Sequence, residues 1–393
     1  MKRQASNEAP KNAISTAIIE LFGGHGGMDY YDFGLARGLL AAGCRVSLYT
    51  CDETADPQMT GLCFYPVFRK VFGPGNNLMR ACRYFAGALE ALTRAVLHGE
   101  KICHLHLFHG AKQELALILL AKLFGRTVII TVHDVESFFP GATSRARIGR
   151  VYRLASRLIV HNQVSKQELI EKLGIPPAQV EVVPSGNYLS EVTDTCQPAE
   201  AKRALGIGET SRVILFFGHI REVKGLDILL EAIPAVARAI PEVVLLVAGR
   251  PLRKDFSSYE ETIDRLGIRD RCVLHIRHIP NNELPLFFAA SDVVALPYRR
   301  IYQSAVILMA MSYRKAVVVS NLPGMTEMVT DGENGYVFVS GSDVSLSEQL
   351  IRALRDDDGR EKTALNALDY IRENNDWEQI GKKTAALYRS VLS

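Results

Sequence analysis

The sequence lacks any apolar run long enough to cross a membrane. No window of about 18 residues is apolar and uncharged throughout, and residues 1–16 lack the apolar core of a secretion signal. A large excess of one charge is also missing, because 46 basic residues stand against 43 acidic ones. A nucleic-acid partner would favour a stronger basic balance. These absences predict a soluble or surface-bound protein of the cytoplasm with no nucleic-acid partner.

Paired cysteine motifs are absent as well. The chain has seven cysteines, an odd number, and none of them forms a CxxC pair. Most lie in apolar runs such as residues 102–105, so they are expected to be buried, reduced thiols. Reduced thiols are typical of a reducing compartment.

The 393 residues, of which 48% are hydrophobic, are enough for two domains with cores of their own. In the first half, short β-branched runs alternate with helical patterns such as residues 33–42 and 113–124, which favours a parallel sheet covered by helices. The runs expected to form strands are residues 16–22, 45–50, 102–108, 127–133, 157–161 and 180–183.

The alternation restarts in the second half. Residues 187–201 show no periodicity and contain Pro198, which predicts a linker. The fold class is therefore α/β, with two Rossmann-like domains facing across a cleft, over residues 1–190 and 200–373. The second strand series is residues 213–217, 243–248, 273–276, 293–297, 316–320 and 336–339.

A glycine-rich loop follows the first expected strand. Glycine tolerates positive φ and close approach of a ligand, and a strand–loop–helix layout can cradle a phosphate. A structural turn is an equally good interpretation of this loop. Its residues are Gly23, Gly24, His25, Gly26 and Gly27.

Two further strand-to-helix loops lie in the second half. Gly218 is followed by Arg221 and Lys224, the kind of fixed positive charge that a diphosphate needs, although solvated loop residues would look the same. Residues 296–306 lead into a helix whose first free amides, at Ser304, Ala305 and Val306, favour an anion.

The second half of the chain resembles the C-terminal domain of glycosyltransferase family 4, which has the two-Rossmann GT-B fold. The resemblance extends to a Pro-Asn-Gly-like turn at residues 184–187 and to a final helix around Trp377, over residues 376–393, that crosses back to the first domain. The motifs that match in order and spacing are residues 224–225, 282–297, 310–311, 315–320 and 331–335.

The resemblance implies hexosyl transfer from a nucleotide sugar, retaining and independent of metal and cofactor. The donor, a UDP- or GDP-sugar, would bind the C-terminal domain through Lys224 and Arg221, with Gln303 and Gly24 also at the donor. The acceptor, a glycan or a polyprenol-linked sugar of polysaccharide biosynthesis, would bind the N-terminal domain. There, His109 matches the family's active-site histidine, 24 residues before His133. His104, His106 and His109 also raise metal binding, but no metal is expected.

One departure from the family pattern concerns two glutamates spaced eight positions apart. Here those positions hold Ile301 and Met309, so recognition of the ribose has to come from elsewhere, while Gln303–Ala305 resembles a known variant of this loop. A catalytically impaired binding partner is therefore kept as an alternative, and a sugar-nucleotide epimerase is kept as another because it shares the fold.

Two basic stretches predict contact with an anionic membrane surface on the cytoplasmic side, and a solvated helix face is the competing interpretation. One is residues 68–84, where basic and aromatic residues mix. In the other, residues 141–160, Arg150, Arg153 and Arg157 are expected on one helical stripe. The arginines of this second stretch are Arg145, Arg147, Arg150, Arg153 and Arg157.

Overall fold

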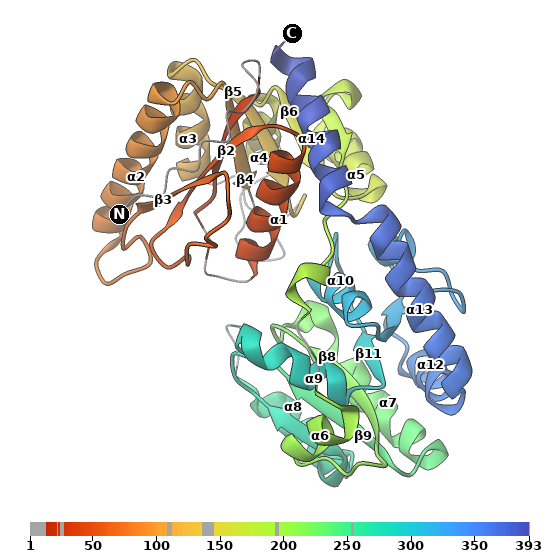
Figure 1. Cartoon of the computed structure of the whole chain (residues 1–393). Helices are drawn as coiled ribbons and strands as arrows, with labels where there is room; N and C mark the ends of the chain where they lie inside the picture. The colour runs from red at the N-terminus through yellow and green to blue at the C-terminus, as the bar shows by residue number, and fades with distance from the viewer. Residues whose placement is uncertain are drawn as a thin grey trace. The chain divides into compact units, whose positions relative to one another are not determined.

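The computed structural model describes residues 13–21, 23, 27–107, 112–135, 145–192, 196–252 and 255–392. The chain divides into two compact units (Figure 1). Unit 1 comprises Met1–Gly186 and Asn375–Ser393, and unit 2 comprises Asn187–Asn374. Each unit is described here by itself.

Unit 1 contains a seven-stranded parallel sheet in the order β3-β2-β1-β4-β5-β6-β7. The strands are β1 (Ser15–Ile19), β2 (Arg45–Cys51), β3 (Leu62–Phe68), β4 (Ile102–Leu107), β5 (Thr127–Val132), β6 (Arg157–Val160) and β7 (Val180–Val182). Its helices are α1 (Met28–Ala41), α2 (Asn77–Leu97), α3 (Lys112–Leu123), α4 (Arg145–Arg153), α5 (Gln163–Leu173), the short 3-10 helix η1 (Pro177–Gln179) and α14 (Trp377–Leu392).

Strand β3 was not predicted, and its sequence explains why. Pro66 interrupts the run, and proline cannot donate to a ladder, so it is tolerated only at a sheet edge or a bulge. The strand lies at the edge of the sheet, and its register against β2 shifts between Thr50 and Cys51.

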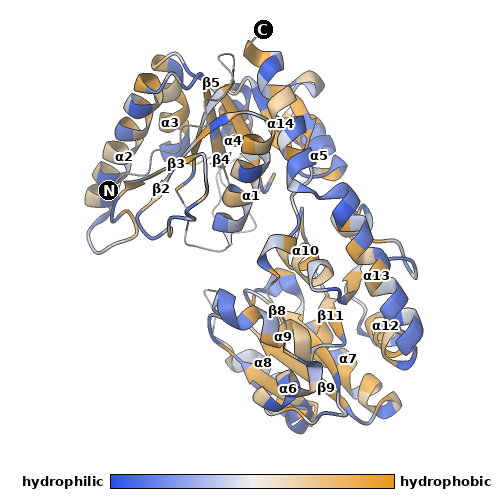
Figure 2. Cartoon of the chain, viewed as in Figure 1, coloured by the Kyte–Doolittle hydropathy of each residue, from blue (hydrophilic) through white to orange (hydrophobic). Residues whose placement is uncertain are grey.

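Unit 2 contains a six-stranded parallel sheet in the order β10-β9-β8-β11-β12-β13. All six predicted strands are confirmed to within one residue at either end. Figure 2 shows the strands of this sheet mostly in the colour of hydrophobic residues. The strands are β8 (Arg212–Phe217), β9 (Val243–Ala248), β10 (Cys272–His275), β11 (Val293–Leu296), β12 (Ala316–Ser320) and β13 (Tyr336–Phe338).

Helices surround this second sheet, and α7 and α12 contribute to one core with strands β8, β9 and β11. The α-helices are α6 (Pro198–Ala204), α7 (Leu226–Ala239), α8 (Ser257–Arg265), α9 (Leu284–Ala290), α10 (Ala305–Ser312), α11 (Pro323–Thr326), α12 (Asp343–Arg355) and α13 (Asp357–Asn374). The 3-10 helices are η2 (Leu189–Glu191), η3 (Glu222–Lys224), η4 (Arg269–Arg271) and η5 (Asn281–Glu283).

The predicted linker is in large part structured. Pro198 opens α6, a position where its fixed φ and missing N–H are tolerated. The side chain of Asn187 donates to the carbonyl of Ile371, and the amide of Tyr188 donates to the hydroxyl of Ser312 at 3.0 Å. This segment therefore belongs to the packed part of unit 2.

Two other expectations are wrong. Arg157 does not share a helical stripe with Arg150 and Arg153, because α4 ends at Arg153 and Arg157 begins β6. The cysteines are not uniformly buried, since Cys63 on β3 and Cys82 on α2 are exposed.

Within the described residues, no helix is long and apolar enough to cross a membrane.

Candidate functional site

The loops that follow β8 and β9 are in direct backbone contact. Gly218 has φ 104°, and its amide donates to the carbonyl of Ala248 at 2.9 Å. A Cβ on Gly249 would lie 1.8 Å from the carbonyl oxygen of Gly218, so only glycine fits there. A Cβ on Gly218 itself would lie 3.5 Å from Val306, which brings the start of α10 to the same place. The loop after β8 and the start of α10 meet where the strand order reverses, between β8 and β11, the usual ligand position in such sheets.

Lys224 is held against an aromatic ring by the turn around it. Gly225 has φ 67°, and a Cβ there would lie 1.8 Å from the carbonyl oxygen of Pro297. This close approach places the Lys224 ammonium 3.7 Å from the ring centroid of Tyr298, a cation–π contact. Tyr298 is 1% exposed, and its hydroxyl lies 3.2 Å from Oγ of Ser304. No described carboxylate forms an ion pair with Lys224.

Several cations converge on the same loop. Burial, followed by the positive charges of Arg250, Lys224, Arg221 and His278, lowers the pKa of His219. The loop after β8 therefore carries an excess of positive charge, which attracts an anionic ligand.

Arg250 and His278 were not among the predicted site residues. Arg250 lies two residues after the end of β9, and Arg221 lies four residues after the end of β8. The carbonyl of Arg250 accepts from the amide of Ile220 at 2.9 Å. A cation directly after a strand next to the switch point was the signal that could have found it. Arg299, in contrast, is committed to a paired contact with Asp227, with both nitrogen–oxygen distances at 2.6 Å.

The start of α10 contributes backbone amides. Ser304 is its N-cap residue, but the Ser304 side chain makes no capping hydrogen bond. Ala305 is exposed, and Gln303 and Val306 are partly buried. The uncapped amides and the positive end of the helix dipole favour an anion at this point.

Helix α10 offers no carboxylate for a ribose, because none of its residues is acidic. Met309 is 8% exposed, and Ile301 is partly buried. The two positions at which the family usually has glutamates, 301 and 309, therefore carry apolar side chains in this protein.

The predicted acceptor-side residues are only partly described. His109, Gly24, His25 and Gly26 lie outside the described residues. A Cβ on Gly23 would lie 2.1 Å from the hydroxyl oxygen of Thr54, so packing demands glycine at this position.

His133 is buried within a cluster of histidines and has a lowered pKa. Its Nε2 lies 3.4 Å from Nδ1 of His106, its ring centroid is 5.2 Å from that of His161, and the ring of Tyr31 packs edge-on at 5.0 Å. Burial is the main cause of the shift, followed by the charges of His161 and His104. Gly27 has φ 84° and is the N-cap residue of α1.

In the described part of the chain, no group of three or more His, Cys, Asp or Glu residues is arranged to hold a metal ion. The site residues that the structure brings together are those of unit 2. They are Gly218, Arg221, Lys224, Ser304, Ala305 and Val306, joined by Arg250 and His278.

Comparison with known families gives two matches that together span most of the chain. Residues 25–189 match the model described as Glycosyltransferase Family 4, and residues 198–369 match the one described as Glycosyl transferases group 1. The fold and the two matches define a GT-B glycosyltransferase. The chain belongs to glycosyltransferase family 4 and is a hexosyltransferase.

Similar proteins agree with this assignment. A D-inositol 3-phosphate glycosyltransferase of Kribbella flavida is 28% identical, over 94% of this chain and 92% of the relative. HepE of Anabaena, solved with UDP, has a TM-score of 0.74 at 20% identity, covering 96% of this chain and all of HepE. WaaG, a glycosyltransferase involved in lipopolysaccharide biosynthesis, has a TM-score of 0.69 at 19% identity, covering 95% of this chain and 99% of WaaG.

Proposed function

We propose that this enzyme moves a hexose from a UDP- or GDP-sugar to a lipid-linked or polysaccharide acceptor. The observation that carries the proposal is the convergence of Lys224, Arg221 and Arg250 with the uncapped start of α10. This arrangement suits a diphosphate, which needs several donors and fixed positive charge. HepE, which has the same fold, was solved with UDP and with UDP-glucose.

The proposed reaction breaks the bond between the sugar C1 and the oxygen of the β-phosphate and forms a bond from C1 to an acceptor hydroxyl oxygen. The hydroxyl proton passes to the departing diphosphate. Lys224, Arg221 and Arg250 stabilise the negative charge that grows on that leaving group, the usual role of preorganised cations. We propose retention of configuration and no metal requirement.

The acceptor is assigned to unit 1, with His109 and the loop of residues 23–27 facing the sugar. The names of the relatives span two acceptor classes, because one is an inositol phosphate glycosyltransferase and WaaG acts in lipopolysaccharide biosynthesis. His109→Ala is expected to lower transfer strongly while the thermal stability stays that of the wild type. Full activity in this variant would remove the assignment.

A thermal-shift screen of UDP-, GDP- and ADP-sugars tests the donor assignment, because a ligand that binds the native state raises its stability. We expect one nucleotide class to raise the melting temperature, followed by transfer across an acceptor panel. Binding without transfer to any acceptor would favour an impaired binding partner. Conversion of the donor sugar with no acceptor present would favour an epimerase.

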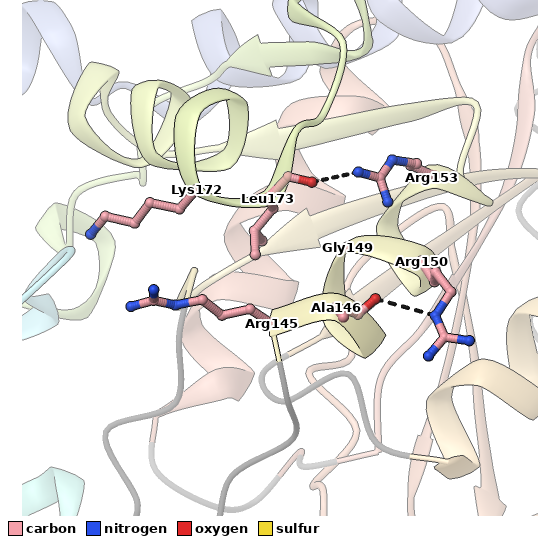
Figure 3. A pocket seen from close by; sticks show the side chains of 7 residues that line it. All are labelled: Arg145, Ala146, Gly149, Arg150, Arg153, Lys172 and Leu173. Carbon is pink, nitrogen blue, oxygen red and sulfur yellow. Dashed lines mark hydrogen bonds between the residues drawn. The ribbon is translucent and has the colours of Figure 1, made fainter.

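We also propose that α4 contacts an anionic membrane surface, which would place the enzyme peripherally on the cytoplasmic face. Arg145, Arg147 and Arg150 are exposed on this helix. They are better candidates than Arg153, whose guanidinium donates to the carbonyl of Leu173 at 2.6 Å. Arg145, Arg150 and Lys172 are among the residues that line a pocket of about 420 Å³ (Figure 3).

Co-sedimentation with vesicles tests this surface. The wild type is expected to bind anionic but not neutral vesicles, and less so as salt rises, because exposed charges are screened within ~8–10 Å. Replacing Arg145, Arg147 and Arg150 with glutamate should abolish binding and leave donor affinity unchanged. Equal binding to neutral vesicles would identify these arginines as an ordinary solvated face.

A further inference from the structure

Unit 1 contains a second pocket, of about 610 Å³, between helices α2 and α3 and the carboxyl ends of β1, β3 and β4. Its volume is in the range of small-molecule sites. Most of its walls are apolar or aromatic. The apolar and aromatic lining residues are Ile19, Leu21, Phe68, Val71, Phe72, Ala81, Tyr84, Leu107 and Leu117.

The pocket is also lined by polar residues, of which Tyr84 already has a hydrogen-bond partner. They are Asn77, Arg80, Tyr84, His106, Gln113 and Glu114. The Tyr84 hydroxyl donates to the carbonyl of Gln113 at 3.1 Å, and the Tyr84 ring stacks on Phe68 with centroids 5.9 Å apart. A sugar or an inositol phosphate needs many hydrogen-bonding partners, and this aromatic wall does not supply them. A hydrocarbon chain needs none and gains free energy from such a wall.

The helix that borders the pocket also carries an exposed apolar stripe. Leu78 is 73% exposed and Leu89 is 51% exposed, and Cys82, Phe85 and Val96 share their side of α2 at helical spacing. Exposed apolar stripes of this kind mark contact surfaces. Asn77, Arg80, Ala81 and Tyr84 line the pocket from the adjoining face of the same helix. A chain that leaves the pocket can therefore continue along the stripe.

Two charged residues line the pocket, Arg80 from α2 and Glu114 from α3. The first acidic residue of α2 is Glu90, which pairs with Arg69 and Arg94. Arg80 lines the pocket, and its side chain has no hydrogen bond or ion pair to any described residue. A second copy of the chain would bring like charges together, whereas a phosphate would complement Arg80.

We propose that this pocket binds the hydrocarbon chain of the acceptor and that Arg80 pairs with the phosphate joining the chain to the sugar. The inference rests on the proposed transferase function and narrows its acceptor to phosphate-linked lipids. It separates this enzyme from relatives whose named acceptor is inositol 3-phosphate.

Monomeric dodecyl phosphate and hexyl phosphate, titrated into the full-length protein without vesicles, test the proposal. Each buried methylene is worth about fourfold in affinity, so the six additional methylenes of the dodecyl probe, if all are buried, should make it bind about 4000-fold more tightly. Arg80→Gln should weaken dodecyl phosphate about tenfold but leave dodecanol unchanged. Equal affinity for both chain lengths would overturn the chain site, and an unchanged affinity in Arg80→Gln would overturn the phosphate contact.

Two substitutions on α2 make the test specific to the pocket. Ala81→Phe fills it and should weaken dodecyl phosphate at least tenfold, while Ala86→Phe, on the exposed part of the same helix, should not. Phe72→Ser, at a partly exposed lining position, should also weaken binding of dodecyl phosphate and replaces Ala81→Phe if that variant fails to fold. Wild-type affinity in both pocket variants, or binding only when vesicles are added, would overturn the proposal.

UDP binding by the same proteins keeps this proposal apart from the proposed function. Unaltered UDP affinity in Ala81→Phe is expected, because the donor residues belong to unit 2. Chain binding without any nucleotide binding would support the pocket and contradict the transferase assignment. Nucleotide binding without binding of the hydrocarbon chain would support the transferase assignment and contradict the pocket.

Discussion

The basic residues around the loop after β8 differ in their interaction partners. Lys224 forms a cation–π contact with the Tyr298 ring, and Arg299 is paired with the carboxylate of Asp227. The positive charge of Arg250 helps to lower the pKa of His219. Charge alone therefore does not identify the residues that bind a ligand. The distinction depends on whether a carboxylate already neutralises the cation.

Arg250 gives a prediction that the sequence did not make. Arg250→Ala should weaken donor binding about tenfold, the effect of losing one charged hydrogen bond. Arg238→Ala, at an exposed arginine on α7, is the matched control and should leave affinity unchanged. Calorimetric titration of the donor measures both, and an Arg250→Ala protein with wild-type affinity would exclude this arginine from the site.

The buried His104 gives a pH prediction. Burial lowers the pKa of His104 to about 3, and its two ring nitrogens lie 2.7 Å from the hydroxyls of Tyr388 and Thr131. The unfolded chain binds a proton near pH 6.5 and the native state does not, so the stabilising contribution is complete above that pH. It is lost as the pH falls from 6.5 towards 3, by about 2 kcal/mol between pH 7 and pH 5.

Urea unfolding at pH 7 and pH 5 measures this effect. His104→Gln, which keeps hydrogen-bonding capacity without titrating, should reduce the difference between the two pH values by about 2 kcal/mol. The exposed His278→Gln is the control and should keep the wild-type difference. The same pH dependence in His104→Gln and the wild type would show that His104 is not the source.

Among the elements, α1 and α14 are in unusually close contact, although one begins at residue 28 and the other at residue 377 (Figure 1). A Cβ on Gly38 would lie 2.0 Å from the carbonyl oxygen of Trp377, and one on Gly381 would lie 2.0 Å from the carbonyl carbon of Gly38. Glycines on both helices therefore allow the two backbones to touch, and the Trp377 ring packs on Tyr31.

Gly38→Ala should destabilise unit 1 by about 1–3 kcal/mol, because the added methyl group forces the two helices apart. The better helix propensity of alanine, worth about 1 kcal/mol, would act in the opposite direction. Gly208→Ala, whose added Cβ would meet only the Ser211 hydroxyl at 3.2 Å, is the control. Differential scanning calorimetry measures the change, and an increase in stability for Gly38→Ala would contradict the contact.

Element prediction from the sequence was most accurate where a strand is buried on both faces. The six strands of unit 2 are nearly continuous apolar runs, so their pattern was sufficient. Edge strand β3 was missed because Pro66 and exposed positions break the pattern. The end of α4 was missed because tertiary contacts set it: the side chain of Gln179 donates to the carbonyls of Tyr152 and Ala155.

At the scale of the whole molecule, the repeated strand–helix series and the family motifs were enough to predict the fold class and the transferase activity. The site was harder to predict. Arg221 and Lys224 follow a recognisable motif, whereas Arg250 enters through a backbone contact between loops that are about 30 residues apart. The apolar pocket beside α2 is built from three strands and two helices, so no single segment of sequence contains it.

The central claim is that the loop after β8 in unit 2 binds the diphosphate of the donor. Calorimetric titration of UDP and GDP into the wild type, Lys224→Ala and the exposed-lysine control Lys362→Ala tests it most directly. Loss of a charged hydrogen bond costs about 1.5–3 kcal/mol, so Lys224→Ala should bind the preferred nucleotide about 10–150-fold more weakly, with Lys362→Ala unchanged. Wild-type affinity in Lys224→Ala, or no binding of either nucleotide to the wild type, would contradict the claim.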